Sequence, residues 1–389
     1  MEMTLVEKIF AKVTGKEKVS LGEVVKIRPS YIMINDGEGH KCVDLINKTK
    51  GVANKDNIIV ILDHDIPAGS FDSAANQKKL IDFSKEYDLK FIQSAGIGYQ
   101  ILLDSYVKTG DIIVSCGTHN SIFGAKGALG LNLTVKNMAT LLMEGSIEMS
   151  VPETVNVVLK GTLETGVYAS DFISKMISEV GIDGFDGKVI EFTGDAIRYL
   201  SLNDKIVLCS MITQTGAVSG FINEIAKGNY AKTCEYDLAK VTPTVTMPGD
   251  LYTTKPALEL KGITIQAGFI GGCNGGRIED LRIAADILKG KRVKLGVRLM
   301  IGSVSNAVYL QAMKEGLIET FLAFGAQVTN PGCASCKSTS IGVVGDDEIL
   351  ITTGSHNYPG CVGTKDSKVY IASAAVIANA AITGYIYKK

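Results

Sequence analysis

Short runs of apolar residues that end in polar clusters recur along the chain, and this pattern constrains the fold more than any other feature. Residues 58–62 are five consecutive apolar residues, and the polar stretch 63–65 follows them directly. A second apolar run ends near residue 115 and leads into the polar stretch 116–121. Runs of this length are typical of strands buried on both faces. With a helical pattern over residues 73–90 between them, they predict an α/β fold whose parallel or mixed sheets are covered by helices.

Composition narrows the class of protein. The 389 residues are 46% apolar and include 42 glycines, which suits a large α/β enzyme with room for two or three domains. A net charge of -1 provides no basic field, so we expect neither a nucleic-acid nor a membrane partner. Eight cysteines are too sparse for a disulfide scaffold and indicate reduced thiols. With no signal peptide and no spanning segment in view, we expect a cytoplasmic protein.

Changes in pattern along the chain indicate three α/β domains. The first is predicted at residues 1–163 and the second at residues 164–258. Irregular, proline-containing sequence near residues 242–249 precedes the third, which is predicted at residues 259–389.

Two cysteine-containing turns in the third predicted domain are the strongest candidates for chemistry. Cys333 and Cys336 form a Cys-x-x-Cys pair, and Cys273 lies on a distant turn with glycines on both sides. Three thiolates can occupy three corners of an iron–sulfur cube, which leaves the fourth iron open as a Lewis acid. A zinc site, a redox pair or plain packing would also explain a Cys-x-x-Cys pair, and spacing alone does not choose among them.

Two histidines lie where predicted strands end. His64 follows the first apolar run and His119 follows the second. Each could be an ordinary loop or core histidine. Because the carboxyl ends of parallel strands meet at one edge of a sheet, they could equally face a shared cleft.

With these motifs in hand, the chain resembles the family of aconitases and isopropylmalate isomerase large subunits. Residues 269–282 look like the segment around the family's first cluster cysteine, and residues 331–336 look like its Cys-x-x-Cys. Further matching segments occur in the family's order: Asp63-His64, Ser94-Ala95-Gly96, Thr118-His119, Gly124-Ala125-Lys126-Gly127 and Gly354-Ser355-His356-Asn357-Tyr358. The resemblance covers nearly the whole chain. It implies three aconitase-like domains with a cleft between them, and hydro-lyase chemistry on a hydroxy acid.

The resemblance also implies roles for particular residues. Cys273, Cys333 and Cys336 would hold a four-iron–four-sulfur cluster. Asp63, His64 and His119 would be catalytic. The substrate-binding positions would be Asn35, Thr118, Ser210, Gln214, Ser355, His356 and Cys361. The family's proton-abstracting serine lies on a separate swivelling domain that finds no counterpart here, which implies a small partner subunit.

Several positions depart from the family's pattern. His356 and Cys361 stand where the resemblance leads us to expect arginines that clamp substrate carboxylates. Other departures are Gln214 for Glu, Ser210 for Asn, Gly117 for Asp, and Phe123 and Tyr99 for His. Together they remove charges and proton carriers. The substrate is therefore expected to be less anionic than citrate or isopropylmalate.

Two alternatives stay open at this point. The chain could be a non-catalytic or retooled paralogue, such as a cluster-bearing binding or regulatory protein. In addition, Cys116 or Cys361 could reach the fourth iron, remain a free thiol beside the cluster, or simply pack.

Overall fold

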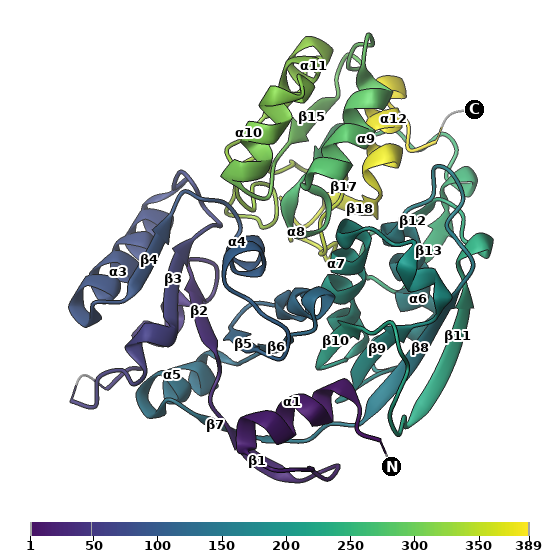
Figure 1. The fold of residues 1–389 in the computed structure, drawn as a ribbon. Helices are drawn as coiled ribbons and strands as arrows, with labels where there is room; N and C mark the ends of the chain where they lie inside the picture. Colours follow the sequence, from purple (N-terminus) through teal and green to yellow (C-terminus); the bar gives the residue numbers. More distant parts are fainter. Residues whose placement is uncertain (1, 48, 388–389) are drawn as a thin grey trace.

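Three large sheets organise the protein in the computed structural model, which describes residues 2–47 and 49–387 (Figure 1). The first sheet has five parallel strands in the order β4-β3-β2-β5-β6. Its strands are β2 (Tyr31–Asn35), β3 (Ile58–Leu62), β4 (Lys90–Gln93), β5 (Ile112–Ser115) and β6 (Leu129–Asn132). Its helices are α1 (Leu5–Thr14), α2 (His40–Val43), α3 (Phe71–Tyr87), α4 (Gly98–Ser105) and α5 (Val135–Glu144).

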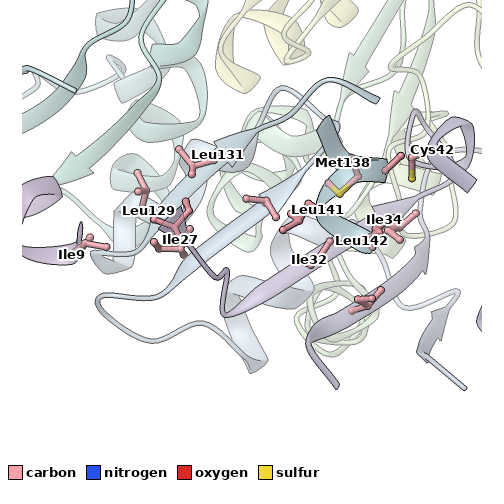
Figure 2. Packing of buried hydrophobic residues seen from close by; sticks show 14 of the residues in the cluster. Ile9, Ile27, Ile32, Ile34, Cys42, Leu129, Leu131, Met138, Leu141 and Leu142 are labelled. Carbon is pink, nitrogen blue, oxygen red and sulfur yellow. The ribbon is translucent and has the colours of Figure 1, made fainter. Parts of the chain in front are cut away.

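The first sheet is buried on both faces, as its apolar runs predict. All five residues of β3 are buried, and successive side chains point to opposite faces. Ile58 and Val60 pack in a cluster with residues of α1 and α5, part of which Figure 2 shows. Ile59 and Ile61 pack on the other face with residues of α4. An antiparallel pair, β1 (Val24–Ile27) with β7 (Ile147–Ser150), flanks this unit.

The second sheet has four parallel strands in the order β10-β9-β8-β11. They are β8 (Thr154–Lys160), β9 (Val189–Thr193), β10 (Ser219–Ile222) and β11 (Lys232–Asp237). Helices α6 (Ala169–Val180) and α7 (Leu202–Met211) pack against them in a separate apolar cluster. Helix α7 begins at a capping box, because the Ser201 hydroxyl accepts the Asp204 N–H and the Asp204 carboxylate accepts the Ser201 N–H.

The third sheet has seven strands in the order β13-β12-β18-β17-β14-β15-β16, parallel except around β12. Its strands are β12 (Thr244–Thr246), β13 (Thr254–Pro256), β14 (Ala267–Ile270), β15 (Arg298–Ile301), β16 (Gln327–Val328), β17 (Ile349–Thr352) and β18 (Lys368–Ala372). Its helices are α8 (Gly272–Gly275), α9 (Ile278–Leu288), α10 (Asn306–Lys314), α11 (Leu317–Phe324) and α12 (Ala374–Thr383). None of the described helices combines the length and apolarity needed to traverse a bilayer.

Sheet membership changes close to the predicted domain limits. Strand β8 lies before residue 163 yet belongs to the second sheet, and β12 and β13 lie before residue 258 yet belong to the third. The division at residues 163 and 258 itself stays a prediction.

The three units meet near the centre of Figure 1, where α7 contacts α8 and residues of α4, α7 and α8 pack in one cluster. One buried cluster contains Ile61 and Leu102 of the first unit, Ile206 of the second and Val304 of the third. Because this cluster is apolar and nearly free of solvent, it fixes the three units at one point. The candidate site lies beside it.

Candidate active site

A cavity of about 310 Å³ opens between the first and third units, beside the cluster where the three units meet. It brings together most of the sequence-predicted site residues, from segments more than 200 residues apart. The predicted residues that line it are His64, Thr118, His119, Cys273, Cys333, Cys336, Ser355 and His356. Asp63, Asn35, Ser210, Gln214 and Cys361 do not line it.

Two loops of the third unit bring the three cysteines to this cavity. Cys273 lies on α8, directly after β14. Cys333 and Cys336 lie on the loop after β16, where Ala334 adopts a left-handed backbone conformation with φ of 47°. The Cys333 N–H donates to the carbonyl of Asp63 over 3.0 Å, so the loop is tied to the carboxyl end of β3. The thiols and His64 therefore share one corner of the cavity.

The three thiols form a contiguous group. Cys333 is hydrogen-bonded to both Cys273 and Cys336, and these bonds raise the pKa of Cys333. The hydrogen bond from Cys333 lowers the pKa of Cys336 to about 7. Ligand atoms of Cys333, Cys336 and His64 all lie within 4.8 Å of one another. The lowered pKa of Cys336 favours its thiolate, the form in which sulfur binds a soft metal centre.

His64 is held by two carboxylates. Its Nδ1–H donates to Asp63 over 2.5 Å and lies 3.7 Å from Asp36. Burial by itself would lower the pKa of His64, but the Asp63 charge and the hydrogen bonds of both carboxylates raise it well above its ordinary value. With an 18% exposed side chain, His64 therefore presents a cationic imidazole to the cavity.

Asp36 is a site residue that the sequence analysis missed. Its carboxylate accepts the backbone N–H groups of Asp63, His64 and Asp65 at 2.9, 3.0 and 3.2 Å. Burial would raise the pKa of Asp36, but its bonds with His64 hold it well below the usual range. Asp36 directly follows β2, the neighbour of β3 in the sheet, so the polar-cluster pattern at strand ends could have identified it.

His119 has the opposite environment. Its Nδ1–H donates to the Ser210 carbonyl over 3.4 Å, which leaves Nε2 to accept from the Ser355 hydroxyl over 2.9 Å. Burial and the neighbouring His356 lower the pKa of His119 to about 3. Burial also lowers the pKa of His356, whose ring lies 6.0 Å from that of His119. This side of the cavity is therefore neutral.

Ser210 and Gln214 lie behind the cavity wall. The Ser210 hydroxyl donates to Asn274, which lines the cavity, so Ser210 acts on the cavity through its neighbours. Gln214 contacts the hydroxyl of Tyr252 through its own backbone carbonyl. The structure gives Gln214 no place in the cavity lining.

Asn35 and Cys361 are also set back from the cavity. Asn35 is 3% exposed, its carbonyl oxygen accepts the Glu38 N–H over 3.5 Å, and its Nδ2 has no hydrogen-bond partner among the described residues. Cys361 is 2% exposed and lies 3.5 Å from the His356 carbonyl. Cys116, by contrast, lines the cavity, where the neighbouring Cys42 thiol lowers its pKa.

Two departures from the family's pattern prove to be one spatial feature. Tyr99 lines the cavity beside Gly117, and its hydroxyl lies 3.3 Å from that of Ser115. A Cβ atom on residue 117 would lie 1.8 Å from the Tyr99 hydroxyl. Glycine at 117 therefore makes room for tyrosine at 99, a coupling that two sequence-distant positions do not reveal.

Arg277 positions the Cys273 turn. Its guanidinium is 4% exposed and donates to the Cys273 carbonyl over 2.6 Å, to Gln100 over 3.0 Å and to Asn203 over 3.3 Å. These partners come from all three units. Because the guanidinium does not line the cavity, it supports the cysteine turn and is not available to a ligand.

The residues present fit an iron–sulfur cluster with three protein ligands. Thiolates are the usual ligands of such clusters, and three hydrogen-bonded cysteines face a cavity that is otherwise lined by neutral or imidazole side chains, Glu38 and Lys337. Cys116 lies on the cavity wall, where its thiol interacts with the free thiol of Cys42, and Cys361 lies outside the lining.

Comparisons with known proteins identify the family of the chain. The model of the aconitase family (aconitate hydratase) matches residues 7–227 and 250–384. A probable methanogen homoaconitase large subunit from Methanothermobacter thermautotrophicus is 31% identical, over 99% of this chain and 97% of that protein. A 3-isopropylmalate dehydratase large subunit from Wolinella succinogenes is 34% identical, over 99% of both chains.

Among solved structures, holo aconitase X from Thermococcus kodakaraensis matches with a TM-score of 0.55 at 12% identity, over 99% of this chain and 94% of that one. This likeness shows the fold alone. With the family match and the relatives above 30% identity, the chain belongs to the aconitase family and is an aconitase-type hydro-lyase. The predicted fold class and family are thereby confirmed.

Proposed function

We propose that this chain is the large subunit of an iron–sulfur hydro-lyase or isomerase that dehydrates or rehydrates a hydroxy acid. The observation that carries the proposal is the meeting of Cys273, Cys333 and Cys336 with His64 at one cavity. The relatives' names support the large-subunit assignment. A small subunit with a swivelling domain would complete the site.

A four-iron–four-sulfur cluster, held by the three cysteines, would supply a Lewis acid for the substrate hydroxyl. His64 would bind that hydroxyl and donate a proton as water leaves. Asp63 and Asp36 hold the ring in place and keep it protonated. His119 is neutral, so it would orient the substrate by hydrogen bonding together with Ser355 and Thr118.

The substrate is expected to be less anionic than citrate or isopropylmalate. His356 is neutral and Cys361 lies outside the cavity lining, so neither replaces an arginine clamp. Glu38 adds a carboxylate to the cavity wall. All eight cysteines are free, which supports action in the reducing cytoplasm.

The test is anaerobic co-purification with the small subunit, followed by a hydroxy-acid panel. Turnover is scored by the ultraviolet absorbance of the conjugated double bond that dehydration creates. The proposal predicts iron and sulfide in the protein and turnover of at least one singly charged acid in preference to citrate. Zinc in place of iron, or no turnover by a fully loaded complex, would refute it.

The alternative of a non-catalytic, cluster-bearing paralogue is less well supported. The relatives reported above are named as enzymes, and Cys273, Cys333, Cys336, His64 and His119 all reach the cavity.

A further inference from the structure

The cavity carries little positive charge for a site that would take an acid. Within the described residues, Lys337 is the only lysine or arginine among the lining side chains. It directly follows Cys336, so the turn that carries the thiols also places this ammonium beside them. Arg277 lies outside the cavity lining, where its guanidinium donates a hydrogen bond to the Cys273 carbonyl.

The other charged groups at this corner are mostly acidic. Glu38 lines the cavity, and Asp36 and Asp63 lie under His64. Both remaining cavity histidines are neutral, as described above. His64 and Lys337 are therefore the two cations that an anionic ligand can meet at this corner, and with His64 assigned to the hydroxyl, Lys337 is the one left for a carboxylate.

A purely structural ion pair is the competing explanation. The Lys337 Nζ lies 3.1 Å from the carboxylate of Asp65, which is 6% exposed, while the lysine side chain is 31% exposed. Asp65 also accepts hydrogen bonds from the hydroxyls of Ser73 at 2.8 Å and Ser340 at 3.2 Å. The buried carboxylate is thus supported by other donors as well. An ammonium has three N–H groups, so one acidic partner leaves it able to bind a ligand.

We propose that Lys337 binds the substrate carboxylate and so determines the charge class of the substrate. The inference rests on the proposed function and sharpens it. A single ammonium is a point charge and cannot form the paired fork of an arginine, so it suits one carboxylate. With His64 at the same corner, the ligand would be a small hydroxy monocarboxylate whose two groups reach Lys337 and His64 together.

The test pairs a change of side chain with a change of ligand charge. Lactate and 3-hydroxybutyrate, and the neutral amide of each, are titrated calorimetrically into the anaerobic, cluster-loaded complex with its small subunit. In the wild type, at least one acid should bind more tightly than its amide. Lys337→Met should weaken acid binding about 10- to 100-fold and leave amide binding nearly unchanged, because only the acid loses a charged hydrogen bond. Lys337→Arg should keep most of the preference for the acid.

Asp65→Asn serves as the matched control, because it breaks the ion pair but keeps the ammonium. It should retain the preference for the acid. The inference is overturned if Lys337→Met weakens acid and amide alike, if Asp65→Asn reproduces the Lys337→Met result, or if the wild type shows no preference for either acid. Binding is measured without turnover, so a complex that binds acids through Lys337 but dehydrates none would refute the proposed function alone.

Discussion

His64 and His119 face the same cavity from strand ends of the same sheet, yet their environments are opposite. Two carboxylates surround His64 and keep its ring charged. A carbonyl, a hydroxyl and another imidazole surround His119 and keep it neutral. The difference teaches that a residue type and its place on the fold do not determine its protonation state. The groups packed against each ring decide it.

Under the proposed function, this division gives the cavity two sides with separate tasks. The His64 side combines thiols, carboxylates and a proton donor, which suits bond breaking at a hydroxyl. The His119 side offers neutral hydrogen-bonding groups, which suit orientation. Changes on the two sides should therefore differ in size and in pH dependence.

The largest effect should follow from removing a sulfur on the reactive side. Cys336→Ser replaces a thiol with a weaker metal ligand and should abolish both iron binding and turnover. Iron and sulfide content of the anaerobically reconstituted protein provides the measurement. Cys234→Ser, on β11 of the second sheet, should retain both properties. Full iron content and activity in Cys336→Ser would reject the assigned ligand.

The next largest effect should follow from removing the charged imidazole. His64→Asn should lower kcat by about 100- to 10,000-fold, the usual contribution of a positioned proton donor. His40→Asn is the control, since His40 lies outside the cavity lining and its ring bonds to the backbone carbonyl of Asp36, not to the Asp36 carboxylate that holds His64. The measurement is kcat from steady-state kinetics of the wild type and both variants at matched iron content. An unchanged kcat for His64→Asn would erase the functional difference between the two sides.

On the neutral side, the coupling of Tyr99 and Gly117 predicts a loss of stability. Gly117→Ala should cost about 3 kcal/mol, because the new methyl group collides with the tyrosine hydroxyl. Adding Tyr99→Phe removes the colliding oxygen and should recover part of the loss, which urea unfolding of the single and double variants measures. Strictly additive losses would show that the two positions are independent.

The smallest effect is the pH dependence of folding stability that arises from His119. Its pKa is about 3 in the folded protein and about 6.5 when unfolded, so the unfolded state binds the proton first as the pH falls. Stability is therefore lost between about pH 6.5 and 3, by about 2 kcal/mol at pH 5. His119→Gln should remove this loss in urea unfolding at pH 7 and 5.

The contribution of His64 to stability should change with pH in the opposite direction. Its folded pKa is raised, so its contribution is complete below the unfolded value and is lost as the pH rises through the folded value. Equal acid sensitivity in the wild type and His119→Gln would show that the two histidines do not differ as described.

The sequence was sufficient to predict the fold class, because buried strands and polar strand ends are local patterns. It also identified the three cysteines, His64 and His119 as candidate site residues. It missed Asp36, Lys337 and the Tyr99–Gly117 contact, since each depends on a neighbour from another segment. It placed Gln214 and Cys361 among substrate-binding positions, and both lie outside the cavity lining. The Gln214 backbone carbonyl accepts from the Tyr252 hydroxyl, and the Cys361 thiol lies 3.5 Å from the His356 carbonyl.

The central claim is that a substrate hydroxyl meets an iron held by Cys273, Cys333 and Cys336. Electron–nuclear double resonance of the reduced, cluster-loaded complex, with a processed hydroxy acid labelled with oxygen-17 at its hydroxyl, tests it most directly. The account predicts an oxygen-17 coupling that is absent when only the carboxylate is labelled. Turnover of the acid with no such coupling would contradict it.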